Sequence, residues 1–272
     1  MITAAQAGNT NATATWVGGV CPGATDDVNT GGFAIVQAGG ALTYASLAGG
    51  GSFTATAAFT CLVVTDVLVV CNTAGAITLT LGGGYSGSGN AVDVGSSATL
   101  LTLAFPGGFT NSGSGYGIYN YGTIEDITGY LINSGAGYGI RNQSTITDIS
   151  VSMINSGAGY GIRNHGTITD ISGSVTNSGY TGIYNSGTVS DVSGSVTNSG
   201  YTGIYNSGTV SDVSGVVMGT AGTSYTGSSP ATLTGSIVKS DPALLASNIK
   251  QGVTLLTLAG TFHADILGAG ML

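Results

Sequence analysis

The stretch from Ser172 to Val192 recurs without a change from Ser193 to Val213, and weaker copies precede it back to about Asn111. The copies align on an aspartate, and the numbers of successive aspartates differ by 22, 22, 21 and 21: Asp126, Asp148, Asp170, Asp191 and Asp212. A unit this short cannot enclose a core alone, and its length is typical of one coil of a solenoid. The sequence therefore predicts a stack in which each copy is one coil.

Within a copy, apolar and polar residues alternate with the period of a β-strand, and the alternation resumes after a bend at Asp126. The residues expected to face inward in the first copy are Ile118, Asn120, Gly122, Ile124, Ile127, Gly129 and Leu131. We expect about five coils of 21–22 residues in parallel register, rising about 24 Å at ~4.8 Å per coil. The predicted fold class is all-β, a short parallel β-helix, or β-solenoid.

Three regions follow from this pattern. Residues 1–105 form a β-rich N-terminal region that we expect to cap the solenoid or dock on a particle, and residues 106–217 hold the repeats. Residues 218–272 are expected to form a connector and a C-terminal cap. Within the cap, Asp241, Pro242 and Gly252 have the positions of helix start and stop signals, which predicts one helix at 242–251 and then a strand at 253–258.

Composition excludes several classes of function. The chain has only four cationic residues and a formal net charge of −8, so it offers no basic patch for nucleic acid and no polybasic membrane anchor. Residues 1–16 lack the pattern of a secretory signal, and the longest apolar stretch, residues 61–71, is interrupted and too short to cross a bilayer. Cys21, Cys61 and Cys71 are expected to be buried thiols, with a Cys61–Cys71 disulfide as the alternative.

The polar columns favour structural roles. Two inward columns of asparagine are expected to form amide ladders between coils: Asn120, Asn142, Asn164, Asn185, Asn206 and Asn111, Asn133, Asn155, Asn177, Asn198. The aspartate column is expected at a solvated corner or capping turn amides, with calcium binding as the alternative. Nothing near His165 or His263 in the sequence resembles a nucleophile with an orienting acid, and an evenly spaced aspartate column is not a catalytic constellation. The glycines match no phosphate-loop or dinucleotide pattern. We therefore predict no catalytic, cofactor-binding or metal-binding residues.

One outward column differs from the others, because it contains the only two arginines of the chain among three tyrosines. We call it the Tyr/Arg column: Tyr119, Arg141, Arg163, Tyr184 and Tyr205. Tyrosine and arginine dominate interface anchors, and both stack on sugar rings. The column is therefore our candidate contact site, as a seam between subunits, a glycan-facing strip or plain surface.

The core of the copies, Gly-Ile-x-Asn-x-Gly-Thr-Ile/Val, resembles repeats of parallel β-helix adhesins and of bacteriophage tail and spike proteins (residues 161–168 and 203–210). Residues 219–227, 233–242 and 246–253 look like short segments near the ends of virion proteins of tailed phages. The opening at residues 16–22, with Asp26-Asp-Val, is similar to the first segment of many viral and bacterial β-helical proteins. A long solenoid with carboxylates in a groove is missing from this pattern.

The resemblance implies a structural virion protein of a tailed bacteriophage, without enzymatic activity. It would be a projecting homotrimeric fibre or spike, or a capsid decoration, assembled in the host cytoplasm and located on the particle exterior. Its expected partners are other copies, other virion proteins and host surface glycan, and neither nucleic acid nor membrane insertion is expected. Two alternatives remain, a polysaccharide depolymerase tailspike and an autotransporter-like adhesin of bacteria.

Overall fold

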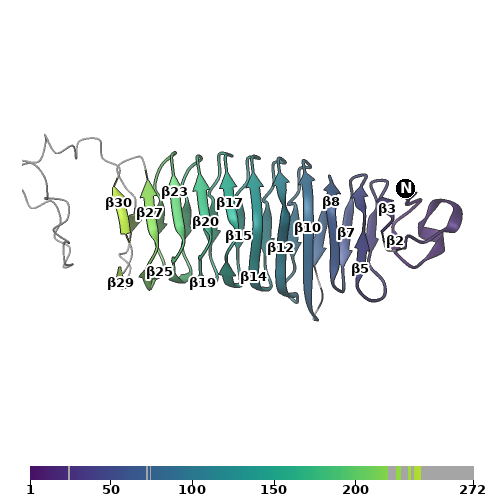
Figure 1. The fold of residues 1–272 in the computed structure, drawn as a ribbon, viewed down its shortest axis with the longest axis horizontal. Coiled ribbons are helices and arrows are strands. Elements are labelled where there is room, and N and C mark those ends of the chain that lie inside the picture. The colour runs from purple at the N-terminus through teal and green to yellow at the C-terminus, as the bar shows by residue number, and fades with distance from the viewer. Residues whose placement is uncertain are drawn as a thin grey trace, which may run out of the picture. The chain divides into compact units, whose positions relative to one another are not determined.

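The computed structural model describes residues 1–219 except 24, 72 and 74, and beyond them the backbone of strands within 225–239. It is a parallel β-solenoid with about ten coils, which confirms the predicted fold class. The strands lie side by side along the stack from the N-terminal end to β30 (Figure 1). The helix expected at 242–251 and the strand at 253–258 lie outside the described residues.

Each coil of the repeat contributes one strand to an 11-stranded sheet and two strand segments to a 17-stranded sheet. The first sheet holds β2 (Gly8–Asn9), β4 (Ala34–Val36), β7 (Ser52–Ala55), β9 (Leu68–Cys71), β11 (Val92–Val94), β13 (Ile118–Asn120), β15 (Ile140–Asn142), β18 (Ile162–Asn164), β21 (Ile183–Asn185), β24 (Ile204–Asn206) and β28 (Tyr225–Gly227). The second holds β1 (Ile2–Thr3), β3 (Asp27–Asn29), β5 (Leu42–Tyr44), β6 (Ser46–Ala48), β8 (Phe59–Thr65), β10 (Ala76–Tyr85), β12 (Thr99–Asn111), β14 (Thr123–Asn133), β16 (Thr145–Ile149), β17 (Ser152–Asn155), β19 (Thr167–Asp170), β20 (Ser174–Asn177), β22 (Thr188–Asp191), β23 (Ser195–Asn198), β25 (Thr209–Val210), β27 (Val216–Gly219) and β30 (Ser236–Lys239). A third sheet pairs β26 (Asp212–Val213) with β29 (Thr232–Leu233).

The expected count of five coils is too low, because the stack extends on both sides of the repeats. On the N-terminal side, β4, β7, β9 and β11 continue the smaller sheet in parallel register. Their spacing is irregular: Phe53 pairs with Val69, whereas Val92 pairs with Ile118, so the coil from Val92 is much longer than the coil from Phe53. On the C-terminal side, β28 pairs with β24 and β30 with β27, so the stack continues past residue 217.

The core is a set of columns that run through the stack, as the alternation predicts. Ile118, Ile140, Ile162, Ile183 and Ile204 pair in register and are fully buried. Larger aromatic side chains fill the N-terminal coils, where Phe53 stacks on Phe59 with ring centroids 4.4 Å apart. Because every coil buries its apolar residues against its neighbours, the hydrophobic effect stabilises the stack as a whole.

Gly129 is the exception to the predicted inward set, because it is exposed. The preceding coil carries a bulge, so that Phe105 pairs with Gly129 but Phe109 pairs with Leu131. Gly129 adopts a φ of 91°, and a Cβ there would collide with the Phe105 carbonyl oxygen. Glycine is therefore required by the backbone at this position and not by the core.

The N-terminal end has a different local structure. Two short 3₁₀ turns, η1 (Thr13–Thr15) and η2 (Val17–Gly19), lie beyond β2 at this end of the stack (Figure 1). Trp16 between them is buried, and its indole Nε1 donates a hydrogen bond to the Thr10 carbonyl at 3.0 Å. Within the described residues, no helix has the length and apolar character needed to cross a bilayer.

Candidate functional site

The two asparagine columns form the predicted amide ladders. In one, Asn142 Nδ2 donates to Asn164 Oδ1 at 2.8 Å, and Asn164 Nδ2 donates to Asn185 Oδ1 at 2.8 Å. In the other, the corresponding bond from Asn111 to Asn133 is 2.7 Å. The same side chains also bond backbone groups at the turns, so the ladders are occupied by structural contacts.

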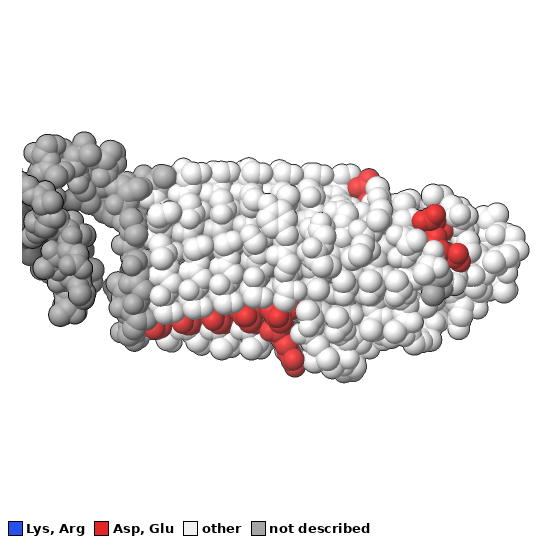
Figure 2. Space-filling model, in the orientation of Figure 1, with Lys and Arg blue, Asp and Glu red and all other residues white. Residues whose placement is uncertain are grey.

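The aspartate column follows one edge of the stack, visible as a red line in Figure 2. Its carboxylates accept hydrogen bonds from serines of the next coil: the Oγ of Ser172 lies 2.7 Å from Asp148 Oδ1, and that of Ser214 lies 2.6 Å from Asp191 Oδ2. Asp191 also accepts from the backbone N–H of Ser214 at 3.1 Å. This is the predicted capping of turn amides, supplemented by serine hydroxyls.

The cysteines are free thiols, so the alternative of a Cys61–Cys71 disulfide is wrong. Cys61 and Cys71 are both buried, as expected, whereas Cys21 is only partly buried. Burial raises the pKa of the Cys71 thiol to about 11, which keeps it protonated at neutral pH. The two buried thiols therefore serve as small apolar side chains of the core.

The Tyr/Arg column lies on the outer face of the 11-stranded sheet, on strands β13, β15, β18, β21 and β24. Its five members pair with one another in register, in the order of the sequence. Beside it runs a second series of tyrosines, which we call the tyrosine row: Tyr116, Tyr138, Tyr160, Tyr180 and Tyr201. The trough is the space between the Tyr/Arg column and the tyrosine row.

In the first part of the trough, the arginines are bound within their own chain. Arg141 Nη1 donates to the Tyr116 hydroxyl at 2.8 Å, and Arg163 Nη1 donates to the Tyr138 hydroxyl at 3.0 Å. The Arg141 guanidinium also lies 4.9 Å from the ring centroid of Tyr119. This distance is in the range of cation–π contacts. Both arginines therefore fill the trough with their guanidinium groups.

The repeat changes at the next coil. The backbone N–H of Gly139 donates to the carbonyl of Tyr160, and in the next coil the N–H of Gly161 donates to the carbonyl of Thr181. Thr181 therefore occupies the register position that a tyrosine holds in the earlier coils. Thr202 takes the same position one coil later, through the bond from Gly182. The tyrosines of these coils come one residue earlier, because the turn is one residue shorter. The small threonines leave the trough open.

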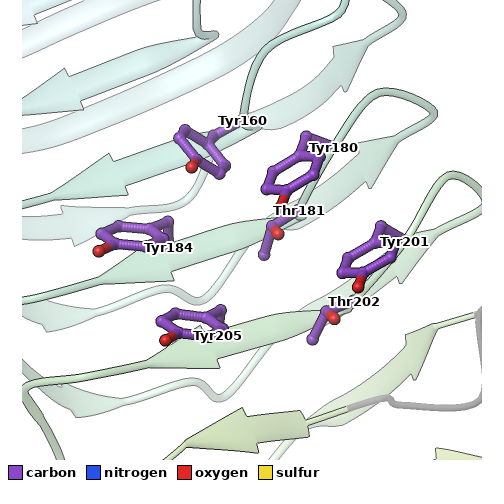
Figure 3. Close-up of a pocket in the computed structure, with 7 residues that line it drawn as sticks. All are labelled: Tyr160, Tyr180, Thr181, Tyr184, Tyr201, Thr202 and Tyr205. Atoms are coloured by element: carbon purple, nitrogen blue, oxygen red, sulfur yellow. The ribbon is translucent and has the colours of Figure 1, made fainter.

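The result is a groove of about 430 Å³ (Figure 3). Its lining residues are Tyr160, Tyr180, Thr181, Tyr184, Tyr201, Thr202 and Tyr205. In Figure 3 the pair Tyr180 and Tyr201 forms one side, the pair Tyr184 and Tyr205 the other, and the threonines lie between them. Within each pair the rings are stacked, with centroids 5.2 Å apart.

Among the described residues, none that lines the groove carries a charged side chain. Burial, followed by the charge interaction with Tyr138, raises the pKa of Tyr160, so this phenol is neutral at neutral pH. At the other end of the strip, burial and then the hydrogen bond to Tyr121 raise the pKa of Tyr119 to about 12. Tyr180 and Tyr201 are the most exposed residues of the groove lining, with exposed fractions of 53% and 49%. The open groove thus presents aromatic rings and hydroxyl groups.

The sequence predicted the register of the Tyr/Arg column and missed the groove. The two threonines were not recognised as part of the site, because their role depends on the register of the shortened turn. The sequence feature that indicates the groove is the turn, which is one residue shorter in the later copies than in the earlier ones. None of the known protein-family models matches this chain, and no match was found among curated proteins or among solved structures.

Proposed function

We propose that this protein is a structural protein that works by contact, on the exterior of a tailed bacteriophage particle. The observation that carries the proposal is the strip formed by the Tyr/Arg column and the tyrosine row, which repeats one kind of surface over five coils in register. Exposed tyrosines in a contiguous strip are typical of interaction surfaces. The resemblance of the repeats to phage tail and spike proteins supports the particle as the location.

The proposed assembly is a homotrimer that also contacts other virion proteins and host surface glycan, after assembly in the host cytoplasm. Because only 6% of the residues are charged, few charged side chains would lose their hydration where the surfaces of copies meet. Each arginine of the strip donates a hydrogen bond to a tyrosine hydroxyl of its own chain. The exposed Tyr180, Tyr201 and Tyr205 are therefore the side chains of the strip that we expect to make contacts.

Sedimentation equilibrium of the full chain tests the trimer. We expect a mass of three times 26.5 kDa, whereas a stable monomer would contradict the proposed assembly. Electron microscopy with gold-labelled antibody against the protein tests the location, and we expect label on the outside of particles. Label confined to cells, with none on particles, would contradict the virion assignment.

A further inference from the structure

The trough is filled differently at its two ends. Near Arg141 and Arg163, a guanidinium group lies over tyrosine rings and donates a hydrogen bond to a tyrosine hydroxyl. Further along, Tyr184 and Tyr205 replace the arginines of the column, and the groove there is open. The chain therefore contains two examples of how this aromatic surface holds a cation, followed by a stretch of similar surface that its own described side chains leave unfilled.

The chemistry of the open groove matches the filled part. Tyrosine rings carry a negative face that attracts cations, and neutral tyrosine hydroxyls accept N–H donors. The Arg163 guanidinium contacts Tyr138, Tyr160 and Tyr184, and the last two also line the groove. We propose that the groove binds the guanidinium group of an arginine side chain supplied by another protein.

The positive charge of Arg163 at the end of the groove does not exclude this guest. Arg141 and Arg163 are partners in the parallel register of β15 and β18, so the trough already holds two guanidinium groups on adjacent coils. Adjacent coils are separated by only ~4.8 Å. A third cation one coil further along repeats an arrangement that the fold tolerates.

A second copy of this chain has no arginine to offer. The sequence contains only two arginines, and both are bound in the trough. The net charge of −8 attracts a basic partner at long range. The partner is therefore a different protein with an exposed arginine. This inference rests on the proposed function, because it takes the strip as a contact surface and specifies what it contacts.

A fluorine NMR titration tests the binding. The full chain is labelled with 3-fluorotyrosine, its resonances are assigned with Tyr→Phe variants, and N-acetylarginine amide is added. We expect saturable shifts of Tyr180, Tyr184, Tyr201 and Tyr205 with a millimolar dissociation constant. N-acetyllysine amide should bind more weakly, because it lacks the planar fork of donors. Sodium chloride at matched ionic strength should leave these resonances in place.

Variants test the location. The double variant Thr181→Tyr/Thr202→Tyr restores the side chains that fill these positions in earlier coils, and should weaken arginine binding by about tenfold or more. Tyr184→Arg should also weaken arginine binding, because the new guanidinium group can occupy the end of the groove in the way that Arg163 occupies the trough in the preceding coil. Thr169→Tyr is the matched control, since it adds a tyrosine at an exposed position away from the groove.

Three results would overturn the inference: shifts that sodium chloride reproduces, equal affinity for the lysine compound, or unchanged arginine binding in the double variant. Sedimentation of the same samples separates this inference from the proposed function. If the double variant alone dissociates the trimer, the groove is a seam between copies, so the inference fails and the proposed function stands. Arginine binding by a protein that is monomeric and absent from particles would instead contradict the proposed function alone.

Discussion

Arg141 and Arg163 occupy equivalent positions but differ in the hydrogen bonds that their guanidinium groups make to the neighbouring side chain. With the Gln143 amide oriented so that its oxygen faces the guanidinium, this oxygen accepts from Arg141 Nε at 2.9 Å and from Nη2 at 3.1 Å. In the next coil His165 takes the place of Gln143, and its Nδ1 contacts Ser186 Oγ at 2.6 Å. Arg163 Nε is buried and has no hydrogen-bond partner among the described residues.

The substitution His165→Gln should therefore stabilise the protein. It provides the missing acceptor for Arg163 Nε, and satisfying such a buried donor contributes about 1 kcal/mol to the free energy of unfolding. Urea unfolding of the two proteins measures the difference. Ser186→Ala is the control for the lost contact between His165 and Ser186, and a His165→Gln variant less stable than this control would contradict the explanation.

His165 also predicts a pH dependence. Burial, and then the charges of Arg163 and Arg141, lower its pKa below the ordinary value of 6.5. The unfolded chain therefore takes up a proton before the folded chain does, so stability is full above about pH 7 and falls as the pH drops through 6.5 towards the folded pKa. We expect the Tm to decrease slightly between pH 7.5 and 5.5. The decrease in Tm should be smaller in the His165→Gln variant. If Tm falls with pH equally steeply in that variant, groups other than His165 cause the pH dependence.

At the scale of the strand and turn, the asparagine ladders combine two tasks. Asn164 Oδ1 accepts from the Gly166 N–H at 3.2 Å, and its Nδ2 donates to the carbonyls of Gly166 and Thr188. The same side chain is bonded to asparagines of the coils on both sides. One residue thus shapes its own turn and fixes the register of three coils.

Replacing Asn164 by alanine should be strongly destabilising. The change removes the hydrogen bonds of Asn164 to the buried amides of Asn142 and Asn185, and to partly buried backbone groups of Gly166 and Thr188. Losing the partner of a buried polar group costs about 1–3 kcal/mol. We expect a total loss of at least about 3 kcal/mol in the free energy of unfolding, measured by urea titration. The exposed Thr169→Ala in the same coil should change it by less than about 0.5 kcal/mol. A similar effect of both substitutions would mean that the ladder contributes little.

The repeats made part of this structure predictable from the sequence. Identical copies align without ambiguity, so the inward columns, the asparagine ladders and the Tyr/Arg column follow from period two and parallel stacking. The N-terminal coils could not be found in the same way, since the coil from Phe53 to Val69 is much shorter than the coil from Val92 to Ile118. The groove was missed for a related reason, because the place of Thr181 is defined by a backbone pairing and not by its neighbours in sequence.

At the scale of the whole molecule, stability is a sum over coils and over the contacts between neighbouring coils. Each coil contacts the ones before and after it, and the copies at 172–192 and 193–213 are interchangeable in sequence. Val189 and Val210, for example, are partners in adjacent coils and belong to the same buried column. If one whole coil is removed, each remaining coil therefore still packs against coils of the same kind.

Deletion of residues 193–213 should give a folded protein with one coil fewer. The new junction, Val192 followed by Ser214, reproduces the native sequence Val213-Ser214, so no strand changes its face. We expect an unchanged β-sheet circular dichroism spectrum per residue and a urea m-value lower by roughly a tenth, because less surface is exposed on unfolding. Deletion of residues 194–213, one residue fewer, is the matched control. It moves the alternation of the following strand by one position, which places Val216 and Met218 in the core and Val217 outside. If identical coils are held together by their register, the first deletion should unfold cooperatively in urea and the second should show a lost or broadened unfolding transition. Equal stability of the two deletions would contradict this explanation.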